Sequence, residues 1–445
     1  MYLAHGVGGR SDLPAPLWLA MYAAGLVVLA SFLVLVTFWH HPRFRGTTAG
    51  RPLPSAVQRF VNSRTLRIPL QAVGVLLYLA TLVTLSFGGE TAADNPAPTW
   101  IFVWLWVGLP VLSVIFGPVW RLVNPLRTIA SGLRSLSPRS RCSPGRGYPE
   151  PLGLWPAAGS LLVFVWLELV YREASRPSTL LAFVLVYSAV HVGFALRFGP
   201  DWFARADGFE VYSELMGRLS VFGRRIGGDL VVRHPFNSLA STRPRDSLVA
   251  VVCVLLGSTA FDGFTRTRVW TDLANRVPEQ PANALLGTAG LLGSVALVTV
   301  LFVGATRGRQ ASRIAVRAAT GVSVPALFAH SLLPIVLGYT VAHYFSFLVF
   351  QGQAGYLLAA DPFGLGWSLF GPSGRAIDYR VVSTTVIGVV QVGAIVLGHV
   401  SGVIAAHDRA MEVFPATERF KAQIPLVVTM IVFTLGGIGL VTGSG

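Results

Sequence analysis

The chain has 445 residues, of which 53% are hydrophobic and only 12% are charged. Soluble domains carry roughly 25% charged residues, so this composition excludes an ordinary soluble protein and indicates an integral membrane protein. The net charge of +15 does not indicate nucleic acid, because the basic residues are spread over many loops and are not gathered in one stripe. We therefore expect the lipid bilayer as a partner, no nucleic acid, and a multi-pass protein of the cell membrane (inner or plasma membrane).

Ten apolar runs have a length close to the roughly 20 residues that a helix needs to cross a bilayer. The predicted spans cover, in chain order, about residues 17–39, 68–87, 100–120, 154–171, 179–196, 247–261, 284–304, 322–350, 382–405 and 424–442. Arginines concentrate in alternate loops, such as Arg43–Arg67 and Arg121–Arg146, which marks these loops as cytoplasmic. The pattern predicts an all-α polytopic membrane protein with about ten transmembrane helices, with the N-terminus and the C-terminus outside, and with one transmembrane domain over residues 1–445.

Two longer segments separate predicted spans. Residues 197–246 are expected to be cytoplasmic, and apolar side chains recur within them at helical spacing. These side chains are Phe209, Tyr212, Met216 and Leu219. The spacing predicts an amphipathic helix on the membrane surface. A cap over the cytoplasmic ends of the spans is an equally good interpretation. The second segment, residues 351–381, is predicted to be an external loop.

The span predicted at residues 322–350 contains Pro334 and Gly338. Proline removes a backbone donor and interrupts a helix, and discontinuous helices line binding sites in transporters. We expect this span and the next one, residues 382–405, to be adjacent and to line a functional cavity, because both carry histidines.

Ionisable residues inside a membrane are costly, and each one is therefore a functional candidate. The predicted span directions place one set toward the cytoplasmic side: His191, His330, His399 and His407. Neutral imidazoles from several helices suit Zn, Cu or haem iron. One haem between His330 and His399 fits this arrangement, and two do not. Each histidine could instead hydrogen-bond a neighbouring carbonyl group or tyrosine.

A second set of ionisable residues lies toward the outer side of the predicted spans. It comprises His343, Glu168, Asp262 and Asp361, with Tyr339 one helical turn before His343. One histidine among several carboxylates can bind a divalent metal and activate water. Structural roles stay open, because Glu168 could pair with Arg172, Asp361 could form a turn, and Asp262 could end a helix.

Both sets supply candidate site residues, and one joint site and two separate sites are both open interpretations. The residues predicted to be catalytic are Asp262, Asp361 and His343. The predicted ligands of a divalent metal, Zn or Cu, are His343, His399 and His407. Haem is a weaker alternative as the cofactor, and the site would act on a small molecule or a metal ion.

Several segments together resemble a bacterial family of integral membrane proteins that is often labelled fenitrothion hydrolase. They are AHGVGGRSDLPAPLW (Ala4–Trp18), GFEVYSELMGRLS (Gly208–Ser220), STAFDGF (Ser258–Phe264), AHYFS (Ala342–Ser346), DPFGLGWSLFG (Asp361–Gly371) and GHVSGVIAAHD (Gly398–Asp408). The resemblance covers nearly the whole chain and implies organophosphate triesters as substrates. The residues that carry it include His343, His399, His407, Asp262 and Asp361, but neither His191 nor His330.

Three functions remain open from the sequence. A membrane-embedded hydrolase would use a metal to activate water against a phosphotriester, and it needs its ligands at one depth. A permease for a metal ion or a small solute can place its histidines in two layers joined by a passage. A protein that holds a single haem or copper is the third hypothesis.

Overall fold

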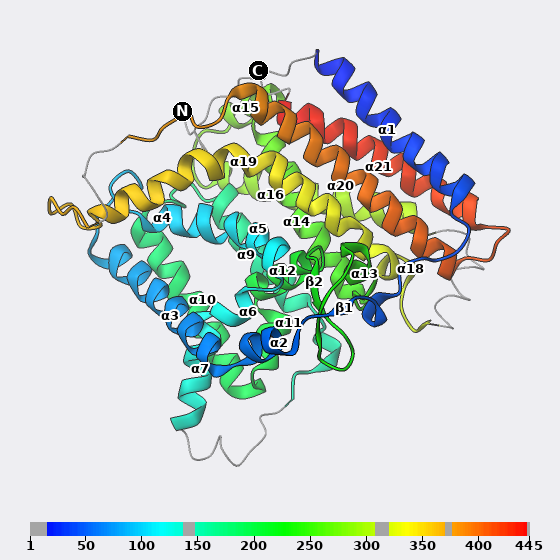
Figure 1. Ribbon diagram of the computed structural model, residues 1–445. Coiled ribbons are helices and arrows are strands. Elements are labelled where there is room, and N and C mark those ends of the chain that lie inside the picture. The colour runs from blue at the N-terminus through cyan, green and yellow to red at the C-terminus, as the bar shows by residue number, and fades with distance from the viewer. Residues whose placement is uncertain (1–15, 137–146, 308–319, 370–375, 443–445) are drawn as a thin grey trace. The chain divides into compact units, whose positions relative to one another are not determined.

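The computed structural model describes residues 16–136, 147–307, 320–369 and 376–442, and helices make up most of this part of the chain (Figure 1). Eight helical runs within it are long and apolar enough to cross a membrane. They are α1 (Leu17–Phe38), α3 (Arg64–Phe87), α10 (Pro177–Phe198), α14 (Asp246–Thr265), α16 (Ala282–Thr306), the run Val324–Ala360, α20 (Thr384–Val413) and the run Arg419–Leu440 of α21 (Arg419–Thr442). The prediction of a mostly helical protein with several helices that could span a membrane is confirmed.

The two other predicted spans take different forms. The region predicted at residues 100–120 contains two helical pieces, Ala97–Leu105 and Gly108–Phe116, whose axes differ by 42°. Within the first piece lies a π-helix, η2 (Trp100–Leu105). The described residues supply nine candidate spans if this bent pair is one of them. The run predicted at residues 154–171 is α9 (Trp155–Leu169), whose 15 residues are fewer than the roughly 20 needed for a straight crossing.

The chain divides into two compact units. Unit 1 comprises Met1–Ala49, Phe236–Phe347 and Arg380–Gly445, and unit 2 comprises Gly50–Pro235 and Leu348–Tyr379. Candidate spans occur in both units. The single transmembrane domain over residues 1–445 stays a prediction.

In unit 1, three apolar helices, α1, α20 and α21, pack side by side (Figure 1). A second group forms where α14 packs along α16. Small residues permit this close packing, because they let two helix backbones approach each other. A Cβ atom on Gly257 of α14 would lie only 2.6 Å from the Cα atom of Val295 on α16. The short helices of this unit are α13 (Pro235–Ala240) and α15 (Arg268–Asn275).

The run Val324–Ala360 consists of α18 (Val324–Phe328), the 3₁₀ turns η4 (Ala329–Leu332) and η5 (Leu358–Ala360), and between them α19 (Leu333–Leu357). Its interruption lies at η4, before the predicted position. Pro334 is the second residue of α19, where proline is tolerated because the first helical N–H groups have no partner within the helix. The helix then continues through Gly338. It ends at Leu357, so the loop predicted from residue 351 begins only after Ala360.

Backbone contact joins α19 to α20, and the expected adjacency of these two spans is observed. A Cβ atom on Gly398 would lie 2.7 Å from the carbonyl oxygen of Pro334 and 3.2 Å from the Cα atom of Gly338. A Cβ atom on Gly402 would lie 2.9 Å from the carbonyl oxygen of Ser331. Glycine at these positions therefore lets the two helix backbones touch.

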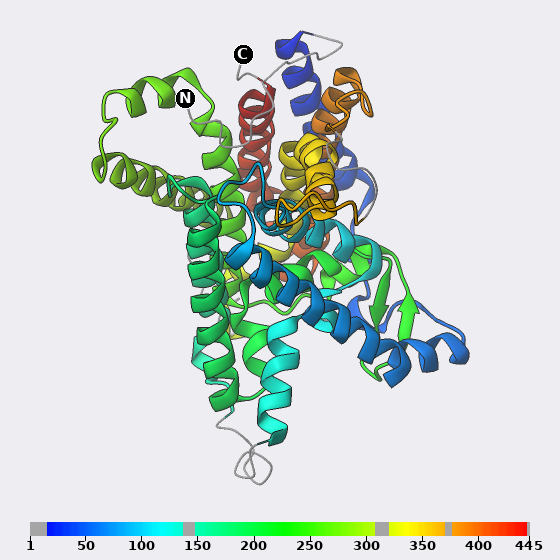
Figure 2. The ribbon, with the colours of Figure 1, turned by 90° about the vertical axis from the view of Figure 1, so that its left-hand side faces the viewer.

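Unit 2 surrounds α12 (Gly208–Gly217) with α5 (Gly108–Phe116), α9, α11 (Asp201–Ala206) and α6 (Trp120–Val123). Further elements are α2 (Ser55–Asn62), α4 (Ala97–Thr99), α7 (Pro125–Leu136) and η3 (Glu150–Leu152). A small antiparallel sheet has the strand order β1 (Arg51–Pro52), β3 (Leu230–Val232), β2 (Phe222–Arg224). Figure 2 shows these strands as arrows beside α2. Residues 197–246 are therefore folded elements and not one surface helix.

The prediction that α12 lies on the membrane surface is wrong. Phe209, Tyr212 and Met216 are buried inside the protein and do not face outward, and Glu210 and Ser213 on other faces of the helix are buried too. Leu219 lies beyond the end of α12 and is half-buried. A helix at a lipid surface keeps its polar face in water. Residues 208–217 thus form a core helix, and the polar side chains that made it look amphipathic find partners inside the protein.

Candidate functional site

Asp262 and His343 form a buried pair in unit 1. Asp262 lies in the last turn of α14, and His343 lies in the middle of α19. The His343 Nε2 atom is 2.6 Å from Asp262 Oδ2, and the two side chains are only 2% and 3% exposed. The hydroxyl group of Tyr344 donates a hydrogen bond of 3.3 Å to the same carboxylate oxygen. The structure therefore brings together two of the three residues predicted to be catalytic, on two candidate membrane spans.

Arg266 completes this cluster, and sequence reasoning missed it. Its Nη2 atom lies 3.1 Å from His343 Nε2 and 3.7 Å from Asp262 Oδ1. Arg266 follows Asp262 by four residues on α14, a spacing that places both on one helix face and could have revealed the contact. The arginine side chain is 36% exposed, so the cluster extends from a buried pair to the surface of the unit.

One ring nitrogen thus has two competing partners. A guanidinium group only donates hydrogen bonds, whereas the carboxylate of Asp262 accepts them. When Nε2 carries a proton, it donates to Asp262. When Nε2 carries none, it accepts from Arg266. The hydrogen-bond pattern of the cluster therefore depends on whether Nε2 carries a proton.

Tyr339 and His399 lie next to each other within unit 1. Tyr339 precedes His343 by one helical turn, and its hydroxyl group donates to the carbonyl oxygen of Phe433 on α21. Its ring meets the ring of His399 edge to face, with centroids 5.6 Å apart. His399 Nδ1 lies 2.9 Å from the carbonyl oxygen of Ile395, one turn earlier on α20. The buried Nε2 atom of His399 has no hydrogen-bond partner within the part of the chain that the structure describes.

Both ring nitrogens of His407 contact protein oxygens. Nδ1 lies 2.8 Å from Gln423 Oε1 on α21, and Nε2 lies 2.9 Å from the carbonyl oxygen of Trp39, directly after α1. The neighbouring Asp408 accepts hydrogen bonds from the Trp39 indole and from the backbone N–H of Arg43. This pair of residues therefore holds the end of α20 to α21 and to the segment after α1.

The predicted metal ligands are not gathered into one centre. His343, His399 and His407 have different hydrogen-bond partners. Within the described ranges, no group of three or more His, Cys, Asp or Glu side chains could hold a metal ion. His330, a weaker candidate, lies 3.0 Å through its Nδ1 atom from the carbonyl oxygen of Leu327.

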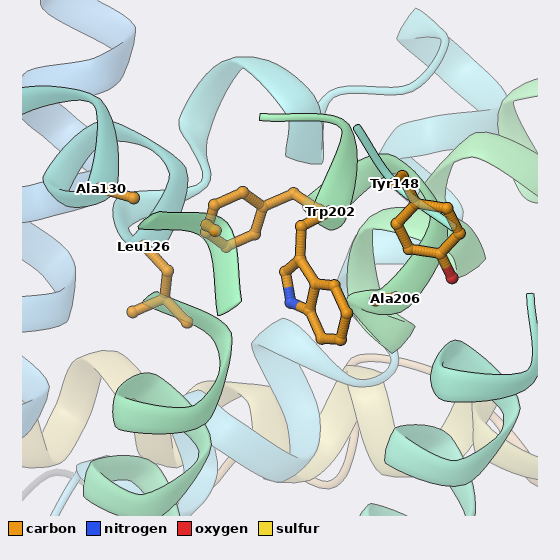
Figure 3. Close-up of a cluster of buried hydrophobic side chains, with 7 residues drawn as sticks. Leu126, Ala130, Tyr148, Trp202 and Ala206 are labelled. Carbon is orange, nitrogen blue, oxygen red and sulfur yellow. The ribbon is translucent and has the colours of Figure 1, made fainter. Parts of the chain in front are cut away.

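Three other candidates, Asp361, Glu168 and His191, belong to unit 2. Glu168 is buried on α9. His191 lies on α10, where its Nδ1 atom accepts a hydrogen bond of 3.1 Å from the Trp202 indole. Trp202 is part of a buried cluster that joins α7, α10 and α11 (Figure 3). His191 thus makes its hydrogen bond with a residue of this hydrophobic cluster, Trp202.

Asp361 forms a turn directly after η5. Its two carboxylate oxygens accept hydrogen bonds of 2.8 Å from the backbone N–H groups of Leu365 and Gly366. Desolvation acts to raise the pKa of the Asp361 carboxyl group, but the N–H groups of Leu365, Gly366, Trp367 and Gly364 outweigh it and hold the pKa below its usual value.

We expect Asp361→Ala to speed hydrogen exchange at the amides of Leu365 and Gly366, because both lose their acceptor. In the wild type, a lowered pKa means that the turn is stabilised at all pH values above the ordinary range of Asp, near 3.9, and that this support is lost only as the pH falls through the lower folded value. Exchange rates corrected for intrinsic pH dependence measure the effect. Equal protection in the variant at neutral pH would show that the carboxylate does not hold the turn.

A second polar cluster, buried in unit 2, was not predicted. Asp207 caps the N-terminus of α12, and its Oδ1 atom accepts hydrogen bonds from the Phe209 amide and, at 2.6 Å, from the hydroxyl group of Tyr187. Asn124 donates to Asp207 Oδ2 at 2.8 Å and to Glu210 Oε2 at 3.1 Å. The amide of one asparagine therefore bridges two buried carboxylates.

Arg127 supplies the positive charge of this cluster. Its Nε atom donates to Glu210 Oε2 at 3.0 Å, and its Nη2 atom donates to Glu210 Oε1. Burial raises the pKa of Glu210 above its ordinary value, although the hydrogen bonds and the charge of Arg127 act to lower it. The carboxylate of Glu210 is thus satisfied by Asn124 and Arg127, which lie in a loop that the sequence marked only as cytoplasmic.

No protein-family profile, no curated protein and no solved structure matches this chain.

Proposed function

We propose that the protein is a proton-coupled permease of the cell membrane for a small solute or a metal ion, and that His343, paired with Asp262, takes up and releases the coupled proton. The observation that supports it best is the burial of this pair on two candidate spans, with Arg266 beside the same ring nitrogen. Ionisable groups inside membrane segments are costly and are typical of proton relays in pumps and transporters.

The geometry supports a reversible exchange of partners. In the protonated state, the imidazolium of His343 donates from Nε2 to the carboxylate of Asp262. After the proton leaves, Nε2 accepts from Arg266, and the guanidinium group stays next to Asp262 as its counter-charge. The carboxylate is therefore paired with a cation in both states, which avoids the large cost of a buried unpaired charge.

Interrupted helices also support transport. The run Val324–Ala360 changes from α-helix to 3₁₀-helix at η4, and the pair Ala97–Leu105 and Gly108–Phe116 is bent. Broken spans are characteristic of transporters. We further propose ten crossings, with α9 and the bent pair counted as spans, and both termini outside. In that topology α14 runs outward, and Arg266 lies near the outer surface.

A hydrolase is the competing function, because the family resemblance implies cleavage of phosphotriesters. His343 would then act as a general base, which must direct a ring nitrogen at the attacking water. Its Nε2 atom already lies beside Asp262 and Arg266. The nitrogen that accepts the proton of the water would therefore have to be Nδ1, with Asp262 orienting the ring.

The permease is tested with proteoliposomes adsorbed on a solid-supported membrane and exposed to rapid pH jumps. Proton binding inside the membrane displaces charge, so the wild type should give a transient current. We expect Asp262→Asn and His343→Gln to lose most of this current. Asp272→Asn, which removes an exposed carboxylate of α15, is the matched control and should retain it.

A chromogenic nitrophenyl phosphotriester, offered to the same preparations with and without Zn²⁺ or Cu²⁺, separates the two functions. The permease predicts no hydrolysis above the buffer rate. Currents that are equal in the wild type and Asp262→Asn, or hydrolysis that disappears in Asp262→Asn, would overturn the proposal.

A further inference from the structure

The helix α2 is turned with its apolar face outward. Val57 and Phe60 lie on one side of its eight residues, and their side chains are 40% and 58% exposed. The polar residues Arg59 and Asn62 of α2 are exposed too, and Gln58 is half-buried. Gln58 Oε1 accepts a hydrogen bond from the Leu230 amide, and Asn62 Oδ1 accepts one of 2.7 Å from Arg224. The protein therefore leaves Val57 and Phe60 uncovered, and such an apolar pair suits an apolar surrounding.

The position of α2 in the chain places it beside the membrane. Ser63 is the only residue between α2 and α3, and its hydroxyl group caps α3 by accepting from the Leu66 amide at 3.2 Å. The helix α3 is a candidate span of 24 residues. Wherever α3 enters the bilayer, α2 therefore lies at the lipid–water boundary.

Positive charge surrounds the apolar face. Arg51, Arg59, Arg64 and Arg67 are exposed, and no Asp or Glu occurs in the sequence between residues 50 and 89. Arg224 adds a further exposed arginine from β2, and Ile226 in the turn after it is 79% exposed. The long stems of such arginines can lie along apolar surface while the guanidinium groups reach the headgroup layer.

We propose that α2 and the turn between β2 and β3 form a docking surface for anionic phospholipid headgroups, with Val57 and Phe60 inserted among the upper parts of the acyl chains. Amphipathic helices bind membranes through buried apolar area together with attraction to anionic lipids. Basic residues near such a surface are attracted to its negative potential, so this arginine group favours the anionic cytoplasmic leaflet over a neutral one.

Site-directed fluorescence quenching tests this surface in the full chain. In a background carrying Cys142→Ser and Cys253→Ser, a fluorophore is attached at Phe60→Cys or, as the matched control, at the exposed polar position Arg59→Cys, which points about 100° away from Phe60 around the axis of α2. Each protein is reconstituted into vesicles of phosphatidylcholine with brominated acyl chains, with or without phosphatidylglycerol. We expect strong quenching at position 60, little at position 59, and an increase at position 60 when phosphatidylglycerol is present.

The role of charge is tested separately. Adding Arg59→Gln and Arg67→Gln to the Phe60→Cys protein should abolish the increase that phosphatidylglycerol causes, while the melting temperature in detergent stays unchanged. Weak quenching at position 60, which a water-facing or protein-covered helix would give, overturns the proposal. So does quenching that is equal at positions 59 and 60, or equal in the two lipid mixtures.

Discussion

Replacing Arg127 by methionine is expected to lower the free energy of unfolding by about 3–5 kcal/mol, because the carboxylate of Glu210 would remain buried without its cation. The Glu210 side chain is 3% exposed and that of Arg127 is 16% exposed. Both oxygens of Glu210 accept hydrogen bonds from this one guanidinium group, and among the residues that the structure describes only Asn124 would remain as a donor. The loss should therefore far exceed that of a surface ion pair.

The loss should also depend on pH. Burial raises the pKa of Glu210, so the folded protein binds the Glu210 proton more tightly than the unfolded chain does. That contribution to stability is complete below the ordinary pKa of Glu, near 4.3, and disappears as the pH rises through the folded value. Removing Arg127 removes a charge that acts against the shift. The variant should therefore differ most from the wild type near neutral pH and least in acid.

Denaturant titration in detergent micelles, followed by tryptophan fluorescence, measures both effects. Arg176→Met is the matched control, because Arg176 pairs with Glu173 on the surface, and it should cost no more than about 1 kcal/mol. The double variant Arg127→Met with Glu210→Gln should recover part of the loss, since no buried charge remains. A similar small cost for Arg127→Met and Arg176→Met would contradict the assignment of a buried ion pair.

The second large effect is expected at the contact between α19 and α20. Gly398→Ala should lower the free energy of unfolding by about 1–3 kcal/mol, which is typical of inserting an extra carbon into a packed interior. The added Cβ atom would lie 2.7 Å from the carbonyl oxygen of Pro334, which is backbone and cannot turn away as a side chain can. The two helices would have to separate.

Gly393→Ala is the control on the same helix. A Cβ atom there meets nothing within 4 Å, so the change should be neutral or should stabilise α20 by up to about 1 kcal/mol through its better helix propensity. Thermal unfolding of both variants in the same detergent gives the comparison. If Gly398→Ala is as stable as Gly393→Ala, the backbone contact does not govern the packing of these spans.

The sequence predicted most of the long helices, because an apolar run of span length has few other stable states. The first span was expected at residues 17–39 and is observed at Leu17–Phe38. The surroundings of α12 could not be predicted in this way. The partners of Glu210 come from Asn124 and Arg127, more than eighty residues earlier, and arginines in that loop were interpreted only as a sign of topology.

The sequence identified the ionisable residues of the candidate site, but it could not show which of them are in contact. The cost of ionisable groups in a membrane identified Asp262 and His343 separately, although they are 81 residues apart in the chain. The same argument grouped His399 and His407 with them, but their surroundings differ, because the depth of a residue along a span does not determine which neighbouring helix it faces. Whether the residues that the structure brings together carry out transport remains the prediction tested by the currents.

The glycines between α19 and α20 also have a mechanical consequence. Where the side chains of two helices interlock, one helix can slide along the other only after these side chains move out of the way. At Gly338 and Gly398 backbone meets backbone, whereas at Gly402 the side chain of Ile335 packs against the glycine. Where backbone meets backbone, no side chain of one helix obstructs movement of the other along its axis. Since His343 is on α19, an axial displacement of that helix would shift its ring relative to Asp262 on α14 and would change which of the two partners of Nε2 is closer.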